Sequence, residues 1–114
     1  MEYLLLIYEE EKRFANLKKP DFDTELSQYR AFGAQFAPNI RGGNALQPTS
    51  AATTVRMRNG KRMTTDGPFA ETKEQLGGYY LIEAADLDAA LAMAEKIPGA
   101  RFGSIEVRPI MKFS

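Results

Sequence analysis

Two short segments of the chain, Tyr3–Tyr8 and Gly78–Glu83, are apolar at nearly every position. Runs of this length are too short for typical helices, and continuous apolarity favours strands that are covered on both faces. A third segment, Gly103–Pro109, alternates instead, with Ile105 and Val107 facing inward. Its closing proline would interrupt a central ladder, so the pattern predicts two central strands and one edge strand.

Two other segments repeat apolar residues at helical spacing. We expect the first helix to start near Pro20 or Asp23, and Asp86 to cap the second. The first apolar stripe consists of Phe22, Leu26, Tyr29, Gly33 and Phe36, and the second of Leu87, Ala90, Leu91, Ala94 and Ile97. Pro38 with Gly42-Gly43, and later Pro98-Gly99, end these helices. The charged stretch between Glu9 and Lys19 is irregular and predicts no regular element.

The segment Thr53–Thr65 contains an Asn59-Gly60 turn and predicts a hairpin. Two registers compete. A two-residue turn would place methionine and arginine together on both faces, whereas a three-residue loop that includes Arg58 pairs Met57 with Lys61 and segregates them. We therefore favour the three-residue loop with a bulge.

The predicted order is strand, helix, strand or hairpin, strand, helix, strand. This order is a ferredoxin-like α+β layout with an antiparallel sheet, and residues 1–114 form one domain. Two helices can cover only one face of the sheet. Since the other face of the two apolar strands would stay exposed, we expect a second copy to cover it in a two-fold homodimer.

The amino-acid composition excludes several kinds of binding and catalytic site. The chain has fifteen basic and fifteen acidic residues, so no net field draws nucleic acid or an anionic membrane. Without cysteine or histidine, thiolate and imidazole metal sites, disulfides and Ser-His-Asp catalysis are excluded. The apolar run after Glu2 is too short for a signal peptide or a membrane helix, so we expect a cytoplasmic protein that contacts neither nucleic acid nor membrane.

The segment Thr65–Tyr80 carries the most distinctive residues, and a connection this long is typical of a binding loop. Its opening Asp-Gly-Pro favours a turn. Two interpretations stay open. The turn is purely structural, or Asp66 faces a ligand in a cleft walled by Phe69, Tyr79 and Tyr80, where it would act as a catalytic proton acceptor.

Neighbouring residues also have two interpretations each. Glu71 and Lys73 either form a solvated charge run or make contacts at a cleft mouth or dimer seam, and oxygen ligation of Mg²⁺ or Ca²⁺ with Glu74 is a weaker alternative. Gly77-Gly78 indicates a bulge at a strand entrance. Arg56 either binds an anionic group or protects an edge strand. The candidate ligand-binding residues are Asp66, Gly67, Pro68, Phe69, Glu71, Lys73, Tyr79, Tyr80 and Arg56; no metal or cofactor is assigned.

At Asp66-Gly67-Pro68-Phe69 the chain resembles the YCII-related proteins of the DGPF-domain subgroup. Further matches are Met1–Tyr8, Leu46-Gln47-Pro48 and Ile105–Ile110, so nearly the whole chain is covered. The resemblance implies ferredoxin-like subunits in a dimeric α/β barrel. It also implies an association with sigma factors of the extracytoplasmic-function type. Some relatives carry a histidine–aspartate pair, which this chain cannot form, so only an aspartate role carries over, with Asp66 its seat.

Three functional hypotheses follow. The first is a small regulatory binding module for an apolar or aromatic molecule or a peptide. The second is a cofactor-free isomerase, lyase or oxygenase of a small aromatic substrate, in which Asp66 or a tyrosine acts as base and an arginine stabilises an oxyanion. The third is a protein-interaction partner, with a sigma factor as the candidate. The fold alone does not decide between them.

Overall fold

A computed structural model describes residues 1–113. Its strands are β1 (Glu2–Glu9), β2 (Ile40–Ala45), β3 (Thr53–Arg58), β4 (Lys61–Asp66), β5 (Gln75–Glu83) and β6 (Ser104–Pro109). Its helices are α1 (Glu11–Ala15), α2 (Lys19–Gln35) and α3 (Leu87–Ala94), with 3-10 turns η1 (Thr49–Ala51) and η2 (Pro98–Arg101). Four antiparallel strands form one sheet in the order β2-β5-β1-β6, which confirms the ferredoxin-like α+β layout with β1 and β5 in the centre and β6 at an edge.

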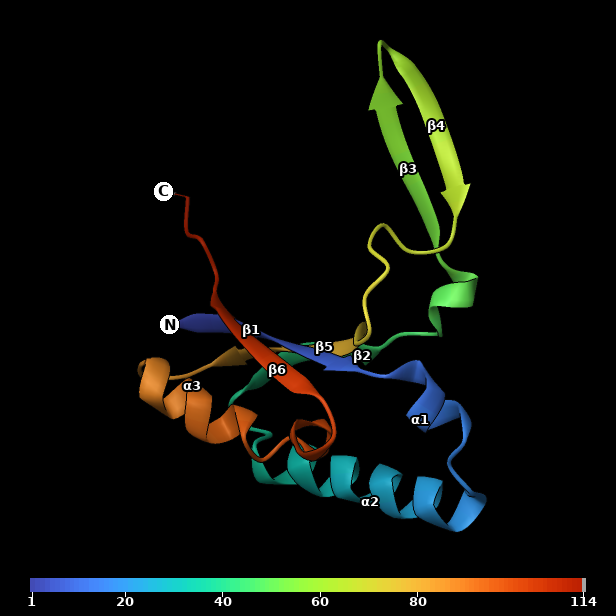
Figure 1. Cartoon of the computed structure of the whole chain (residues 1–114). Coiled ribbons are helices and arrows are strands. Elements are labelled where there is room, and N and C mark those ends of the chain that lie inside the picture. Colours follow the sequence, from blue (N-terminus) through green and yellow to red (C-terminus); the bar gives the residue numbers. More distant parts are fainter. Residues whose placement is uncertain (114) are drawn as a thin grey trace.

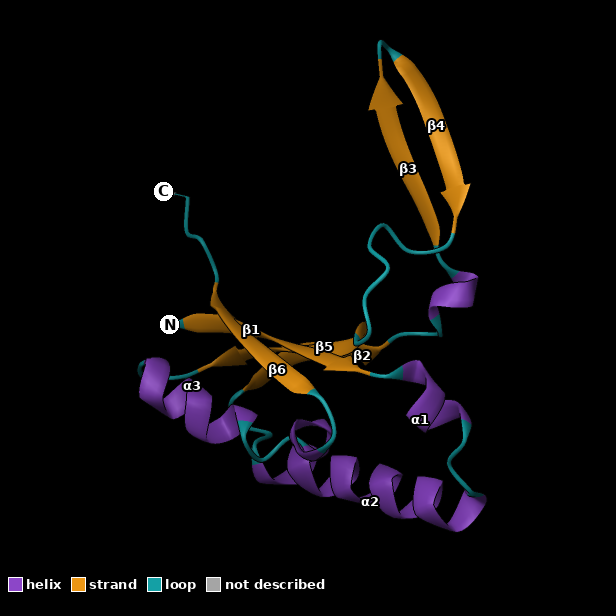
Figure 2. Ribbon diagram, in the orientation of Figure 1, coloured by secondary structure: helices purple, strands orange, loops and turns teal. Residues whose placement is uncertain are grey.

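The helices α2 and α3 lie on one side of this sheet, and the β3–β4 hairpin rises from the other side, with the 3-10 turn η1 near its base (Figure 1, Figure 2). The core forms between sheet and helices. Tyr3, Leu5 and Ile7 alternate along β1 toward the helices and are buried, together with Ile82 of the neighbouring strand. Because side chains alternate along a strand, Leu4 and Leu6 face the opposite side, where they are partly exposed. We call that side the open face.

The apolar stripes expected on the two long helices are partly wrong. The buried residues of α2 are Glu25 and Phe32, whereas Phe22 and Leu26 are exposed. On α3 the buried residues are Ala90, Met93 and Ala94, and both leucines of the expected stripe are exposed. Small side chains let α3 approach the sheet closely, and Asp86 caps it as expected, its Oδ1 accepting from the Ala89 amide at 2.9 Å.

Two segments contain structure that the sequence did not indicate. The charged stretch after β1 forms the short helix α1, and Phe14 on it packs edge-on against Phe22, with ring centroids 5.6 Å apart. The glycines expected only to end the first helix lie inside β2. A side chain at Gly43 would meet the Tyr79 carbonyl oxygen at 2.7 Å, so this strand needs a glycine to approach β5.

The register favoured for the hairpin is also wrong. Arg58 pairs with Lys61, so the loop has only two residues, and Asn59 and Gly60 both have positive φ, at 52° and 75°. These angles match the type I′ turn that Asn-Gly prefers. Separation of apolar from charged faces fixes a register only where one face is buried, and neither face of this hairpin is buried by the rest of the chain.

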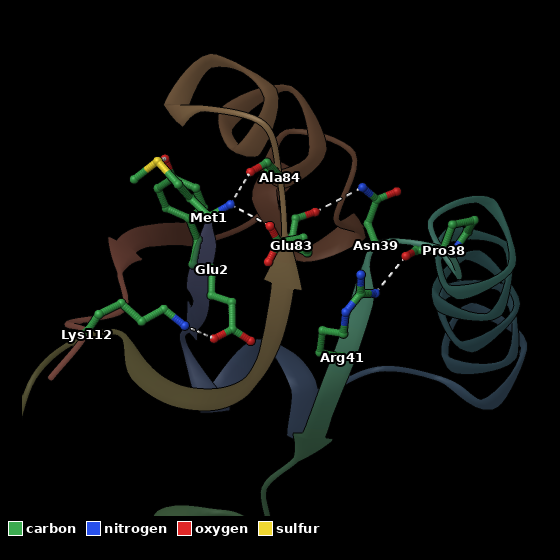
Figure 3. Close-up of polar contacts among 9 residues, drawn as sticks. Met1, Glu2, Pro38, Asn39, Arg41, Glu83, Ala84 and Lys112 are labelled. Atoms are coloured by element: carbon green, nitrogen blue, oxygen red, sulfur yellow. Dashed lines mark hydrogen bonds and ion pairs between the residues drawn. The ribbon is translucent and has the colours of Figure 1, made fainter. Parts of the chain in front are cut away.

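The predicted bulge at the entrance of β5 is confirmed. Ile7 pairs with Gly78 and Tyr8 pairs with Leu76, so Gly77 is the extra residue. At the opposite end of the sheet, the chain's amino group donates to Glu83 Oε1 at 2.5 Å and to the Ala84 carbonyl at 2.9 Å (Figure 3). These contacts fix the start of β1 against the end of β5.

Candidate functional site

The Asp-Gly-Pro motif forms a turn at the base of the hairpin. Gly67 has a φ of 101°, its amide donates to the Ala52 carbonyl at 2.7 Å, and its own carbonyl accepts from Thr54 Oγ1 at 2.8 Å. Asp66 ends β4 opposite Thr53 and is exposed. Together with the half-buried Pro68, the motif fixes the direction in which the hairpin leaves the domain.

The aromatic residues expected to wall one cleft lie in three different places. Phe69 is 77% exposed, and the Arg56 guanidinium lies 5.6 Å from its ring centroid. Tyr79 is on the open face, where its hydroxyl accepts from Asn44 Nδ2 at 2.9 Å. Tyr80 faces the helices, with its ring centroid 5.0 Å from that of Phe32, and burial raises its pKa. Within one chain these residues therefore do not line a common cleft.

The charged residues after the motif make separate contacts. Lys73 Nζ lies 3.3 Å from Glu10 Oε1, and Glu74 Oε1 accepts from Ser104 Oγ at 2.9 Å. Glu71 is exposed. Within residues 1–113 no three acidic side chains gather closely enough to hold a metal ion, so the oxygen-only site considered with Asp66 does not form in this part of the chain.

A cluster that the sequence analysis missed lies between the end of β1, α1 and α2. Glu25 of α2 is only 6% exposed, and its Oε2 lies 2.9 Å from Arg13 Nη2. The other guanidinium nitrogen, Nη1, lies 3.5 Å from Glu9 Oε2. Glu25 Oε1 is buried and has no hydrogen-bond partner among the described residues. One arginine therefore bridges two carboxylates, and one buried carboxylate oxygen has no donor among the described residues.

Two of these residues, Arg13 and Glu25, line an open cavity of about 460 Å³ in the helix layer. Its other lining residues are Leu17, Asp21, Thr24, Gln28, Arg101 and Phe102. The Arg13 guanidinium lies 3.6 Å from the centroid of the Phe102 ring, a cation–π contact that holds the arginine at the cavity wall. The volume is in the range of small-molecule sites.

A second cavity of about 350 Å³ adjoins the first along α2. Gln28 and Arg101 line both cavities and are joined by a hydrogen bond from the guanidinium to the amide oxygen, so this contact marks their border. None of the candidate residues from the sequence lines either cavity.

The pKa values of Glu9 and of the nearby Tyr29 are shifted in this environment. Burial and the nearby Glu25 carboxylate raise the pKa of Glu9, and the Arg13 charge opposes this. Burial and the Glu9 carboxylate raise the pKa of Tyr29 well above its usual range. Both groups therefore hold protons more tightly than in water.

Three successive carboxylates connect this cluster to the motif loop. Glu9 contacts Arg13, and Glu10 contacts Lys73 of the motif loop. Glu11 accepts from the Thr49 amide at 2.7 Å and from its hydroxyl, at the foot of the hairpin. The stretch interpreted as irregular is thus a junction of three segments. Its sequence signal was three acids in a row directly after an apolar strand, a pattern with no periodicity to identify it.

The sheet and its helix layer define a ferredoxin-like α+β domain. Its candidate site is the open polar cavity in the helix layer, near the end of β1. The YCII-related domain matches residues 1–114, and the chain belongs to that family. An uncharacterized protein of Rhizobium meliloti (strain 1021) is 39% identical over 114 residues, which cover 96% of this chain and 92% of that protein.

Among solved structures, the chain is similar to 5-chloro-2-hydroxyhydroquinone dehydrochlorinase (TftG) from Burkholderia phenoliruptrix AC1100, in complex with 2,5-dihydroxybenzoquinone. The TM-score is 0.51 at 13% sequence identity, and the match covers 97% of this chain and 94% of that one. Since sequence identity is this low, the likeness shows a shared fold and nothing about activity or assembly. Within the described residues no helix is long and apolar enough to span a membrane.

Proposed function

We propose that this domain binds a small polar molecule in the cavity lined by Arg13, Glu25 and Arg101. The observation that supports the proposal is the second carboxylate oxygen of Glu25, which is buried without a hydrogen-bond partner among the described residues. Leaving such an oxygen unpaired costs about 1–3 kcal/mol. A ligand hydroxyl or amine that donates to it would recover that cost on binding.

The lining suggests the class of ligand. Arg13 and Arg101 offer guanidinium donors to an anionic oxygen, Glu25 accepts from a donor, and Leu17 and Phe102 supply apolar surface. A small ring that carries both a hydroxyl and an acidic oxygen would satisfy all of these groups. The similar dehydrochlorinase binds 2,5-dihydroxybenzoquinone, a molecule of this kind, and we include it among the probes.

A second proposal is that the domain is a cofactor-free enzyme acting on such a ring. Glu25 would then accept the proton of the bound hydroxyl, and Arg13 or Arg101 would stabilise the developing oxyanion. The observation that favours this proposal is that Glu25 has one oxygen without a donor and pairs through its other oxygen with the Arg13 cation. Asp66 remains an alternative base, because the exposed motif turn leaves it free to face a ligand or another chain.

The regulatory role is a proposal of a different kind. The DGPF resemblance suggests that the domain acts beside an extracytoplasmic-function sigma factor. Its support is the resemblance together with the exposed Phe69 and Arg56 at the base of the hairpin, which offer an apolar and cationic contact to another protein. Co-purification of the sigma factor with the wild-type chain, lost on Phe69→Ala, would support it.

Titration calorimetry tests the cavity proposal. The probes are 2,5-dihydroxybenzoquinone, 2,5-dihydroxybenzoate and salicylate, and the proteins are wild type, Glu25→Gln, Asp66→Asn and the exposed control Glu95→Gln. We expect binding that weakens about tenfold or more in Glu25→Gln, which is the loss of roughly 1.4 kcal/mol. Binding lost only in Asp66→Asn would place the ligand at the motif loop. No binding of any probe, and no added mass in the native mass spectrum of the purified protein, would overturn the proposal.

A further inference from the structure

The two cavities of the helix layer follow one face of α2. Residues three and four positions apart share a face of a helix, and the α2 residues that line the cavities recur at these steps. They include Asp21, Thr24, Gln28, Ala31 and Gln35. Residues 95–102 contribute to the opposite wall of both cavities. At about 1.5 Å of rise per residue, the two together form one groove roughly 20 Å long, which we call the α2 groove.

The two halves of the α2 groove differ in chemistry. The first half contains the buried Glu25 and its ion pair with Arg13. In the second half the lining residues Phe32 and Ile97 are 3% and 1% exposed, so they form an apolar floor. The charged residues that line this half are exposed and lie at its rim. The first half therefore suits the polar end of a ligand, and the second half suits an apolar group.

One contact between side chains marks the join of the two halves. The Arg101 guanidinium donates a hydrogen bond to the amide oxygen of Gln28, and both residues line both halves. Gln28 is half-buried and Arg101 is exposed, so water can replace this bond when the side chains turn away from each other. Separation of the two side chains joins the halves and leaves the guanidinium free to bind an acidic oxygen.

We propose that the α2 groove binds one elongated ligand, a hydroxylated aromatic acid that carries an unbranched apolar substituent. This inference rests on the proposed function and deepens it. The ring and its polar groups occupy the first half, as proposed above, and the substituent lies over Phe32 and Ile97 in the second half. Gln28 stands where the substituent must pass, so it determines the specificity for ligand length.

Titration calorimetry with a homologous series of ligands tests the proposal. The probes are salicylate and its derivatives with unbranched alkyl chains of two, four or six carbons at C4, opposite the carboxylate. A fully buried methylene group contributes about fourfold in affinity. Since the groove is open on one side, we expect the affinity of wild type to rise by about two- to fourfold for each added methylene.

A pair of variants separates the groove from general binding of apolar chains. Ala31→Trp places an indole ring in the second half of the groove. Ala34→Trp adds the same ring at an exposed position of α2 that lines neither cavity. In Ala31→Trp the affinity should no longer rise with chain length, whereas Ala34→Trp should keep the wild-type rise. Gln28→Ala should increase the ratio of the affinities for the six-carbon probe and salicylate by at least about twofold.

A spectroscopic measurement locates the substituent. Nuclear Overhauser effects should connect the terminal methyl group of the six-carbon probe with the side chain of Ile97, which lines only the second half. Salicylate that binds while affinity stays constant along the series, or a rise that both tryptophan variants abolish equally, would overturn this inference and leave the proposed function in place. Failure of every probe to bind wild type would overturn both.

Discussion

Arg13 holds Glu25 by an ion pair of 2.9 Å between Nη2 and Oε2, and the same guanidinium reaches Glu9 at 3.5 Å. The two carboxylates come from a strand and a helix, and the arginine comes from the five-residue α1 between them. A helix this short has little stability of its own. The ion pairs therefore fix α1 in place as much as α1 positions the arginine.

The two partners of this ion pair should differ in their effect on stability. Arg13→Met leaves Glu9 and Glu25 close together without a cation, and we expect a loss of about 3 kcal/mol, the low end for a broken buried pair. The low end applies because the arginine side chain is 24% exposed. Glu25→Gln leaves Arg13 with Glu9 and should change stability by less than about 1 kcal/mol. Urea unfolding measures both, and equal losses would contradict this assignment.

The pKa of Glu9 predicts the sign of a pH effect. Its folded pKa lies above the ordinary value of 4.5, so the folded state binds the proton more tightly than the unfolded state. This stabilisation is fully present below pH 4.5 and is lost as the pH rises through the folded pKa. Between wild type and Glu9→Gln, the difference in melting temperature should therefore move against wild type as the pH rises from 4.5. Glu95→Gln should run parallel to wild type, and a wild type that gains on Glu9→Gln over this interval would refute the assignment.

Two glycines should respond oppositely to alanine. A methyl group at Gly103 would overlap the Tyr8 backbone carbonyl, which cannot rotate away, and we expect a loss of about 1–3 kcal/mol from overpacking. At Gly33, inside α2, a methyl group would meet nothing within 4 Å. There alanine should add about 0.5–1 kcal/mol, because glycine is a poor helix former. Thermal unfolding of the two variants decides the point; a stabilised Gly103→Ala would show that β6 can shift away from β1.

Neighbouring leucines on β1 should separate the core from the open face. Leu5 is fully buried, and Leu5→Ala should cost about 2–5 kcal/mol at every protein concentration. Leu4 lies on the open face and is partly exposed. The cost of Leu4→Ala should be smaller in dilute protein and should grow with concentration if a second copy covers this face. Denaturation at two concentrations measures both; a cost for Leu4→Ala that is independent of concentration would speak against a covered face.

The parts of the fold that the sequence predicted are those with a strong local pattern. The apolar run of β1, the alternation around Ile105 and the cap at Asp86 each follow from neighbouring residues, and each is confirmed. The prediction of the hairpin register was wrong for a physical reason. The predicted register separated apolar from charged faces, but neither face of the hairpin is buried in one chain. The turn preference of Asn59-Gly60 therefore sets the observed register.

The cluster of Glu9, Arg13 and Glu25 could not be predicted from the sequence pattern. Glu25 lies three residues after Phe22 and four before Tyr29, so it borders the apolar stripe expected on α2, and its ion pair with Arg13 stabilises the buried charge there. The two residues are separated by a loop and belong to different helices, so no periodicity relates them. For the motif loop, the turn expected from Asp66-Gly67-Pro68 is present and is held by the hydrogen bonds of Gly67 to Ala52 and Thr54.

The acidic run after β1 has a thermodynamic consequence. Glu9, Glu10 and Glu11, where β1 meets α1, contact the cavity wall, the motif loop and the foot of the hairpin. We expect a ligand that displaces Arg13 to act on the contacts to Lys73 and Thr49 as well. Linkage is reciprocal. If a partner on the hairpin changes the affinity of the cavity for a ligand by some factor, the ligand must change the affinity for that partner by the same factor.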